Sequence, residues 1–425
     1  MKVLVLGTGA REHALLEALA RDGDVTALAA APGNPGMASV ADLIEVDAMD
    51  GAAVARCARD WGADLVVVGP EAPLVAGVAD AVRAVGIDCF GPSREAAALE
   101  GSKAFAKDVM AQAGVPTALA HVCRTVEEVA AALDALGAPH VVKDDGLAAG
   151  KGVVVTDDRA EALAHAQTCL ARGGDAQVVV EEFLDGPEVS LFCLSDGTCV
   201  VPLEPAQDFK RLQDGDAGPN TGGMGAYTPL PWAPPGLVAE VVERVAQPTV
   251  DAMARRGTPF AGLLYVGLAM TSRGPRVVEF NARFGDPETQ VVLARLQSPL
   301  AGLLRAAATG ILAGHPPLRW SDDAAVTVVL ASPGYPASPT TGGVLHGLAA
   351  ADAVEGAHVL HAGTARRGDE IVSAGGRVLS VVGTGPDLDA ARAVAYDALA
   401  RIELDGGQHR TDIAASAARD ARVTA

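Results

Sequence analysis

The sequence predicts a multidomain α/β protein, and three observations carry that expectation. The chain has 425 residues, more than one ordinary core holds, so two to four domains are expected. Apolar residues make up 49% and aromatic residues 4%, which is typical of α/β enzymes rich in Ala, Val and Leu. Strand and helix patterns also alternate over residues 1–100, an order that indicates a parallel sheet covered on both faces.

In this first region two glycine loops follow expected strand ends, where open α/β sheets place their ligands. These loops are GNPG (33–36) and GPEAP (69–73). The expected strands lie near 3–6, 25–30, 64–68 and 87–90, and the expected helices near 11–20, 51–60 and 74–85.

Residues 101–310 show a different pattern, with a long Gly/Pro-rich loop at 204–231 that we expect to be functional or disordered. A third region of short strands begins near 320. The helices expected in these two regions lie near 102–113, 158–171, 236–255 and 386–401, with helical segments from 288. The expected strands lie near 139–143, 152–156, 177–183, 188–203, 261–270 and 276–282.

Charge and cysteine content narrow the class of protein. Lys plus Arg is 33 and Asp plus Glu is 53, a balance of −20 that argues against nucleic-acid binding. The six cysteines show no framework spacing, so free thiols in a reducing cytosol are expected. The short apolar N-terminal run is interrupted by Arg11, and no later run reaches membrane-spanning length. We expect a cytoplasmic protein without membrane partners, and a monomer with a dimer as the alternative.

Lysine is scarce, which draws attention to where it occurs. The chain contains six lysines, at positions 2, 103, 107, 143, 151 and 210. Where arginine serves for ordinary charge, the remaining lysines are candidates for sites that need a compact ammonium on a flexible stem. Four of the six fall in the motifs below, whereas Lys2 and Lys107 are interpreted as chance.

The stretch GTGARE (7–12) resembles a dinucleotide fingerprint but places Glu12 where the third glycine belongs. The second expected strand also ends in AAAP (29–32), without the acid that holds an adenosine ribose. These departures disfavour a nicotinamide or flavin site. Glycines at a helix N-terminus, with Arg11 beside them, still favour a small phosphate ligand. A tight turn required only for packing is the alternative.

The segment VVKDDGLAAGKGVVV (141–155) joins two expected strands through a glycine loop with a lysine at its tip. It lacks the spacing and the Ser/Thr of a P-loop, but a flexible loop of this kind suits a lid over a triphosphate. The next segment, VVVEEFLDGPE (178–188), offers backbone groups to a purine and Glu188 to a ribose. Taken alone, that second motif is better explained as a solvated strand end.

The sharpest signal is VVEFNARFGDPE (277–288), because residues two apart in a strand share a face. Glu279, Asn281 and Arg283 would project together. Carboxylate and amide oxygens suit Mg²⁺, and the arginine can neutralise a transferring phosphoryl group. A structural salt-bridge ladder is the alternative. QDFKR (207–211) and DAGPNTGGMGAY (216–227) form a polar loop that either closes over a substrate or is a disordered linker.

Taken together, these motifs resemble the phosphoribosylamine–glycine ligase family of ATP-grasp enzymes, also called glycinamide ribonucleotide synthetases. The matching pieces run in family order over nearly the whole chain. They are GTGAREHA (7–14), VGPEAPL (68–74), EGSKAF (100–105), DGLAAGKGV (145–153), EEFLDG (181–186), GPNTGGMGAY (218–227), FGDPETQ (284–290), HAGT (361–364) and GGRVL (375–379).

The resemblance implies a Rossmann-like pre-ATP-grasp domain at 1–100 and an ATP-grasp domain at 101–310, with a mobile lid at about 116–188. It also implies a small α+β domain at 320–420. The implied reaction joins glycine to 5-phosphoribosylamine in purine biosynthesis. ATP is consumed through a glycyl phosphate intermediate, with Mg²⁺ or Mn²⁺ as the metal ion.

Site roles follow from the resemblance, position by position. Residues expected at the nucleotide are Lys103, Lys143, Gly150, Lys151, Gly152, Glu181, Glu182, Phe183, Leu184, Glu188, Lys210 and Asn220. Glu279 and Asn281 are expected to bind the metal, and Arg283, Lys151 and Asp286 are expected to be catalytic. Residues expected at the other substrates are Gly9, Arg11, Glu12, His13, Asn34, Pro70, Glu71, Asp208, Asp216, Arg283, Gly285, Asp286, Pro287 and Glu288.

The chain departs from the family pattern at Asp144, Phe209 and Ala282. Asp144 would weaken ATP binding if it faced the neighbouring lysine, but strand alternation points it away. The alternatives to this ligase are another ATP-grasp carboxylate–amine ligase, a carboxylase-type relative, a nicotinamide-dependent oxidoreductase and a non-catalytic binding module.

Overall fold

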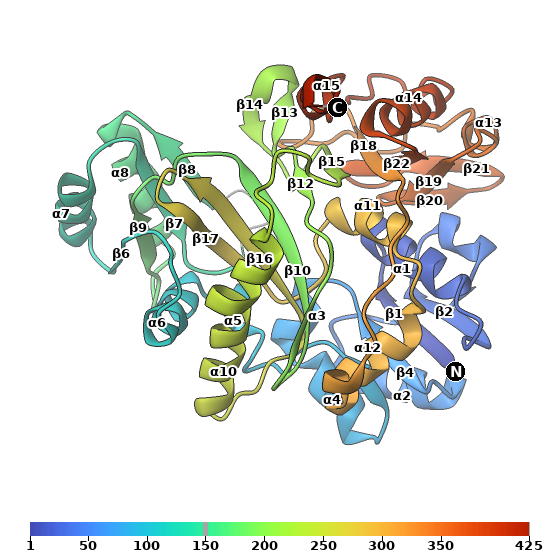
Figure 1. Ribbon diagram of the computed structural model, residues 1–425, viewed down its shortest axis with the longest axis horizontal. Coiled ribbons are helices and arrows are strands. Elements are labelled where there is room, and N and C mark those ends of the chain that lie inside the picture. Colours follow the sequence, from blue (N-terminus) through green and yellow to red (C-terminus); the bar gives the residue numbers. More distant parts are fainter. Residues whose placement is uncertain (148–151, 425) are drawn as a thin grey trace.

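The computed structural model describes residues 1–147 and 152–424 (Figure 1). Its N-terminal region is a parallel sheet in the order β3-β2-β1-β4-β5. The strands are β1 (Lys2–Gly7), β2 (Ala27–Pro32), β3 (Asp42–Leu43), β4 (Leu65–Val68) and β5 (Asp88–Phe90). The helices are α1 (Ala10–Ala20), η1 (Pro35–Ser39), α2 (Gly51–Trp61), α3 (Glu71–Ala76) and α4 (Val78–Ala84). The predicted parallel sheet is confirmed, but the helix expected at 74–85 is two helices separated at Gly77, whose φ is +89°.

The order of strands reverses between β1 and β4, and open α/β sheets bind their ligands outside the carboxyl ends of the strands at such a switch point. The loops after both strands belong to the motifs singled out above. The fold therefore brings the turn after Gly7 and the loop after Val68 to one place.

A second, antiparallel sheet forms the middle of the molecule, in the order β11-β10-β16-β17. Its strands are β10 (Glu188–Asp196), β11 (Val200–Pro202), β16 (Ala261–Thr271) and β17 (Gly274–Asn281). The helices are α5 (Ala98–Gly101), α6 (Lys103–Ala113), α9 (Leu237–Val241), the π-helical turn η3 (Val242–Ala246), α10 (Gln247–Arg255), α11 (Glu288–Arg295), α12 (Leu300–Thr309) and η4 (Leu312–Gly314). Buried side chains of this sheet pack in one continuous core with those of the N-terminal region.

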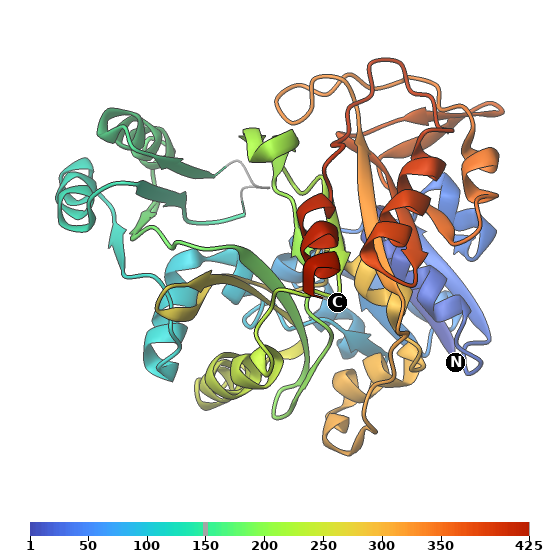
Figure 2. The same cartoon turned by 45° about the horizontal axis from the view of Figure 1, so that its top comes forward.

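A third sheet, in the order β6-β9-β7-β8, carries two helices and has a hydrophobic cluster of its own. Its elements are β6 (Ala120–Cys123), α7 (Val126–Leu136), β7 (His140–Asp144), β8 (Val153–Thr156), α8 (Arg159–Leu170) and β9 (Val178–Glu181). Figures 1 and 2 show these elements projecting from the rest of the molecule. The sequence patterns above miss β6 and α7, although Thr125 and Glu128 form a capping box at the helix start.

The remaining part of the chain consists of segment 204–231 and the C-terminal region from about 320, which share the sheet β12-β15-β18-β22-β19. Its elements are β12 (Gln207–Asp208), β13 (Arg211–Gln213), η2 (Asp214–Asp216), β14 (Ala217–Asn220), β15 (Gly225–Thr228), β18 (Ala324–Ala331), α13 (Leu348–Asp352), β19 (Ala357–His361), β20 (Thr364–Arg367), β21 (Glu370–Ser373), β22 (Arg377–Gly385), α14 (Leu388–Leu399) and α15 (Ala415–Thr424). The long segment 204–231 is thus not a structureless loop, because two of its strands join this sheet. No helix in the described part of the chain is long and apolar enough to cross a membrane.

Candidate ATP and substrate site

Lys143, on β7, links the projecting sheet to the central one. Its Nζ lies 2.9 Å from Oε2 of Glu181 and donates to the carbonyl oxygen of Val278 at 3.1 Å. An ammonium has three N–H donors, and these two contacts leave one of them for a ligand. Lys143 and Glu181 are both buried, so the pair is held away from bulk water.

Lys107, which the sequence patterns left aside, approaches the same carboxylate. Its Nζ lies 3.3 Å from Oε1 of Glu181 and donates to Oγ1 of Thr117 at 2.9 Å and to the carbonyl of Ala118 at 3.2 Å. These three contacts use the full donor set of the ammonium. Burial lowers the pKa of Lys107 to about 8, although the Glu181 carboxylate opposes that shift. The scarcity of lysine was the signal that could have found it.

Asp144, the departure from the family pattern, points away from Lys143. Its Oδ2 lies 2.5 Å from Nη1 of Arg172, while Lys143 faces Glu181 on the other side of the strand. The prediction from strand alternation is confirmed.

The glycine loop after β7 begins and ends beside other parts of the site. Lys103 donates to the carbonyl of Gly146 at 2.9 Å, and the carbonyl of Gly152 lies 3.3 Å from Nε2 of His165. Gly150 and Lys151 lie outside the described residues. Past β9, Glu182 forms an ion pair with Arg273 at 3.1 Å. Phe183 is exposed and Leu184 half-buried, as befits the edge of a site.

The end of β17 has the two faces that its sequence predicts. The side chains on one face are buried, and those on the other are partly exposed. The buried residues are Phe280, Ala282 and Phe284, and the partly exposed ones are Glu279, Asn281 and Arg283. Asn281 lies opposite Tyr265, and Glu279 opposite Gly267, on the neighbouring strand β16. The polar face therefore looks out from the central sheet.

Glu279 is surrounded by positive charge. Burial alone would raise the pKa of its carboxyl, but four nearby cations outweigh that effect and lower the pKa below its usual value. These cations are Lys210, Lys143, Lys103 and Arg283. Within residues 1–147 and 152–424, no protein group donates a hydrogen bond to the Glu279 carboxylate or to the Asn281 amide oxygen. An ionised carboxylate and an amide oxygen without protein donors fit a hard divalent cation.

Metal binding by protein groups alone is not indicated. Among the described residues, no cluster of three or more His, Cys, Asp or Glu is arranged to hold an ion. Two protein oxygens are nevertheless enough for Mg²⁺, which usually completes its shell with substrate phosphates and water.

Arg283 is fixed by carboxylates from the N-terminal part of the chain. Its Nε lies 3.1 Å from Glu71, its Nη2 lies 3.0 Å from Glu100, and its Nη1 donates to the carbonyl of Phe284 at 3.1 Å. Burial raises the pKa of Glu100 despite Arg283, whereas Arg283 and Arg11 overcome burial and lower that of Glu71. A guanidinium has five N–H donors, so two remain for a ligand.

Beside Glu279, two further acids and a lysine form a charged cluster. Lys210 forms an ion pair with Glu188, and the pKa of Lys210 is raised well above its usual value by Glu188 and Asp208, against burial. Burial chiefly, with the carboxylates of Glu288, Glu188 and Glu279, raises the pKa of Asp208 to about 8, against the effect of Lys210. These surroundings therefore favour the protonated form of Asp208.

Glu288 is almost fully buried and belongs to a hydrogen-bond network. Its Oε1 accepts from Oγ of Ser190 at 2.9 Å and from the hydroxyl of Tyr265 at 3.0 Å. Tyr265 and Ser190 were not predicted. With only four tyrosines in the chain, a tyrosine in the middle of an apolar strand is the signal that could have found this one.

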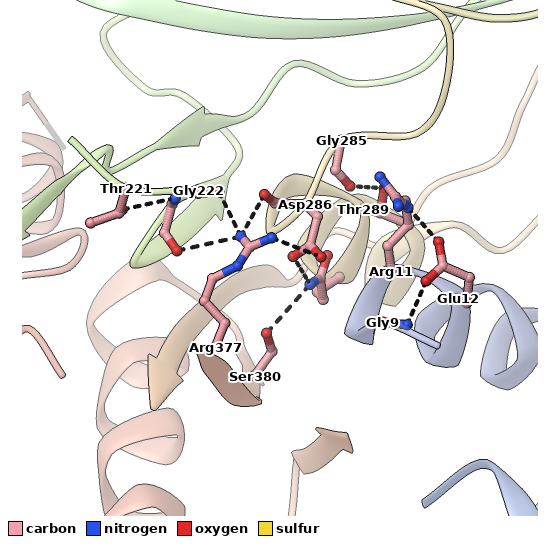
Figure 3. Close-up of polar contacts among 12 residues, drawn as sticks. Gly9, Arg11, Glu12, Thr221, Gly222, Gly285, Asp286, Thr289, Arg377 and Ser380 are labelled. Carbon is pink, nitrogen blue, oxygen red and sulfur yellow. Dashed lines mark hydrogen bonds and ion pairs between the residues drawn. The ribbon is translucent and has the colours of Figure 1, made fainter. Parts of the chain in front are cut away.

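The turn before α1 is filled by its own glutamate, as Figure 3 shows. Glu12 accepts from the amide of Gly9 at 2.6 Å and from Nε of Arg11 at 2.5 Å, and Arg11 also donates to the carbonyl of Phe284 at 3.1 Å. A Cβ on Gly69 would lie only 2.1 Å from Oε1 of Glu12, so that position requires glycine. The carboxylate occupies the place at the helix N-terminus where a dinucleotide phosphate would bind.

Asn34 and His13 join the N-terminal region to the C-terminal one. Asn34 donates to the carbonyls of Thr8 at 2.8 Å and His361 at 2.9 Å, and its Oδ1 caps η1. The amide of His361 donates to Nδ1 of His13 at 2.9 Å. Both residues predicted at the substrate are therefore engaged in an internal contact.

The buried histidine pair is expected to make the protein acid-sensitive. Burial, with the neighbouring His361, lowers the pKa of His13 to about 3, and burial lowers that of His361 to about 4. The unfolded chain therefore binds protons first, and stability is fully present above about pH 6.5 and falls as the pH drops towards 4. At pH 5 each histidine should lower the free energy of unfolding by about 2 kcal/mol, since pH 5 lies about 1.5 units below the unfolded pKa and one unit is worth about 1.4 kcal/mol.

Urea unfolding at pH 7.5 and pH 5 checks this expectation. In His13→Gln the amide oxygen can still accept from His361 but does not titrate, so the variant should lose about 2 kcal/mol less than the original chain. Equal losses of unfolding free energy in the two proteins would show that His13 does not cause the acid sensitivity.

Two further residues predicted at the site lie in η2 and at the end of β14. Asp216, whose φ is +54°, forms an ion pair with Arg410 at 2.7 Å. Asn220 lines an open cavity of about 540 Å³ between β8, the β13–β14 hairpin and residues 336–337. Phe209 packs against the ring of Tyr227 and under the guanidinium of Arg410, which is 4.8 Å from its ring centre.

Pro70, Gly285, Asp286 and Pro287 belong to two turns that were predicted at the substrates. Pro70 occupies the N-cap position of α3, directly before Glu71, and makes no side-chain capping bond. Asp286 accepts from Gln290 at 2.8 Å and forms an ion pair with Arg377 at 3.1 Å. A Cβ on Gly285 would lie 2.6 Å from Oε2 of Glu288, so this position too is constrained by close packing.

A projecting sheet that meets the central sheet at Lys143, close to the Glu279 carboxylate, is the arrangement of an ATP-grasp protein. Three family models cover most of the chain: the N domain of phosphoribosylglycinamide synthetase at residues 1–100, its ATP-grasp (A) domain at 101–289 and its C domain at 325–416. The chain belongs to the phosphoribosylamine–glycine ligase family.

Curated relatives with this name are similar to the chain over nearly their whole length. The phosphoribosylamine–glycine ligase of Streptomyces coelicolor is 71% identical over 421 residues, which cover 98% of this chain and 100% of the relative. The same-named enzyme of Mycobacterium tuberculosis (strain ATCC 25618 / H37Rv) is 60% identical over 424 residues, covering 98% and 99%.

Solved structures share the architecture. The phosphoribosylamine–glycine ligase of Thermotoga maritima gives a TM-score of 0.82 at 32% identity, over 97% of this chain and 100% of that one. Biotin carboxylase from Campylobacter jejuni gives 0.72 at 15% identity, over 96% and 92%, and at that identity the likeness shows the fold alone.

Proposed function

We propose that the chain ligates glycine to 5-phosphoribosylamine at the expense of ATP, giving glycinamide ribonucleotide, ADP and phosphate. The observation that carries the proposal is the Glu279–Asn281 pair. Among the described residues the pair has no protein hydrogen-bond donors, and four cations surround Glu279, in a chain 71% identical to a phosphoribosylamine–glycine ligase. The same pair and the facing Lys143 disfavour a non-catalytic binding module.

ATP lies between the projecting sheet and the central sheet. Lys103, Lys143 and Lys151 contact its phosphates, the strand end from Glu181 to Leu184 lines the adenine, and Glu188 holds the ribose. Glu279 and Asn281 hold Mg²⁺ or Mn²⁺, which neutralises charge on the phosphates. Residues 116–188 act as the lid, between a first domain at 1–100 and the remainder of the ATP-grasp domain, which ends near 310; a third domain spans 320–420.

The reaction proceeds in two steps. A carboxylate oxygen of glycine attacks the γ-phosphorus of ATP, giving glycyl phosphate and ADP, while the two remaining N–H donors of Arg283 stabilise the transferring phosphoryl group. The amine of phosphoribosylamine then attacks the glycyl carbonyl and phosphate leaves. No covalent enzyme intermediate is needed, so positioning and charge stabilisation supply the catalysis.

Purified protein is expected to release ADP from ATP only when glycine and phosphoribosylamine are both present. The measurement is ADP formation with each substrate omitted in turn, and with alanine or β-alanine in place of glycine. ADP release independent of the amine, or a preference for another carboxylate, would favour a different ATP-grasp ligase. We expect the protein to act as a monomer in the cytoplasm.

A further inference from the structure

Arg377, the first residue of β22, reaches from the C-terminal region into the candidate site (Figure 3). Its Nη2 lies 3.1 Å from Oδ2 of Asp286, and its Nη1 donates to the carbonyl of Asp286 at 2.8 Å. The same Nη1 donates to the carbonyl of Gly222 at 2.5 Å and lies 3.5 Å from that of Gly223. One guanidinium therefore binds two chain segments that are far apart in sequence.

Both segments were singled out in the sequence: the turn at 284–288 is expected at the substrates, and the loop at 216–227 either closes over a substrate or is a linker. Asp286 belongs to the turn at 284–288, and Gly222 to the glycine loop at 216–227. Oδ1 of Asp286 is held by Gln290, and Oδ2 lies 3.7 Å from where a Cβ on Gly9 would be. The carboxylate thus sits between Arg377 and the N-terminal turn, where all three regions of the chain meet.

The glycine loop is held from the same side by a second residue of the C-terminal region. The amide of Gly222 donates to the hydroxyl of Tyr335 at 2.9 Å, while its carbonyl accepts from Arg377. At Gly223, φ is +108° and a Cβ would lie 2.4 Å from Cδ of Pro287, so the loop rests directly on the turn. Glycine is required there for this close approach.

We propose that Arg377 is a positioning residue that holds the Asp286 turn and the Gly222–Gly223 loop in one fixed geometry for glycine and phosphoribosylamine. This inference rests on the proposed function. A planar guanidinium can bind a carboxylate and several carbonyls at once, whereas a lysine ammonium is a compact point charge. Arg377 lies on the opposite side of Asp286 from the Gly9 turn, so it acts through Asp286 and the loop.

The test compares Arg377→Lys and Arg377→Met with a matched control, Arg392→Lys. Arg392 lies in the same region, donates to the carbonyls of Ile413 at 3.0 Å and of Thr411, and stacks on Tyr396, but it touches neither segment. Steady-state kinetics are measured for each substrate, together with binding of a non-hydrolysable ATP analogue and urea unfolding.

We expect kcat/KM for glycine and phosphoribosylamine to fall by about 10- to 100-fold in both Arg377 variants, less in Lys than in Met, because small misplacements have effects of this size. Affinity for the ATP analogue should stay within about twofold, and Arg392→Lys should keep its kinetics. Unchanged kinetics in Arg377→Lys, or an equal loss of nucleotide affinity, would overturn the inference.

A different result is expected if the proposed function itself is wrong. In that case the original chain itself would show no glycine-dependent ADP release. If Arg377→Met does not fold, the kinetics of Arg377→Lys test the inference, since lysine keeps the positive charge and a side chain of similar length.

Discussion

Lys143→Met is expected to lower kcat/KM for ATP by about 10²- to 10³-fold, the usual loss on removing one preorganised donor from a charge-stabilising site. The reason is the third N–H of Lys143, which its contacts within the described part of the chain, with Glu181 and the carbonyl of Val278, leave for a ligand. Steady-state kinetics with ATP as the varied substrate measure the effect.

Lys107→Met is the matched control. Lys107 binds the same carboxylate, but all three of its donors are used by Glu181, Thr117 and Ala118. Either substitution leaves Glu181 with one lysine partner, so both variants lose a similar ion pair. The control should keep kcat/KM for ATP within about tenfold of the original value, and urea unfolding should show similar losses of stability. Equal kinetic losses would place both lysines, or neither, at the phosphates.

The N-terminal fold could be read from the sequence because its signals are local. Apolar runs such as Val3–Leu6 and Leu65–Val68 alternate with amphipathic stretches. Each of these runs forms a strand that pairs in parallel with another apolar strand. Segment 204–231 could not be read in this way. Its strands are two to four residues long, and the one that joins the segment to the C-terminal region, β15, pairs with Ala325–Val328, a hundred residues away.

The candidate site, too, could be predicted only where its contacts are local in the sequence. Strand alternation was enough to place Glu279 and Asn281 on one face, since that depends only on neighbours in the chain. The partners of Arg283 could not be found from spacing, because Glu71 and Glu100 are some two hundred residues away. Arg377 is missed for the same reason, although its motif was noted.

The turn at Gly7–Glu12 shows how a departure from a pattern becomes informative in the structure. The missing third glycine excluded a standard dinucleotide fingerprint but did not say what Glu12 does. In the structure the Glu12 carboxylate accepts hydrogen bonds from the Gly9 amide and from Arg11. Glycines at positions 7 and 69 leave space for it, because a Cβ at either would clash with the Glu12 side chain. A side chain of the protein thus meets the anion preference of the helix N-terminus.

Glu279→Gln is expected to reduce the rate of ADP formation by about 10³-fold. The substitution keeps the shape of the side chain but removes the negative charge that faces Lys210, Lys143, Lys103 and Arg283. Electrostatic stabilisation by a bound metal is worth several kcal/mol, and about 1.4 kcal/mol corresponds to a tenfold change in rate. Binding of Mn²⁺ in the presence of an ATP analogue, followed by electron paramagnetic resonance, should weaken in parallel.

The same substitution separates a metal site from a salt-bridge ladder, the alternative left open by the sequence. Asn281→Asp keeps an oxygen at the second position and adds a charge, so Mn²⁺ binding should persist in that variant while it falls in Glu279→Gln. In a purely structural ladder, Glu279→Gln would lower the urea midpoint but leave Mn²⁺ affinity unchanged, because the carboxylate would only be balancing the lysines. We expect both the midpoint and the affinity to fall, since the carboxylate offsets part of the positive charge of four cations in the free protein and binds the metal when ATP arrives.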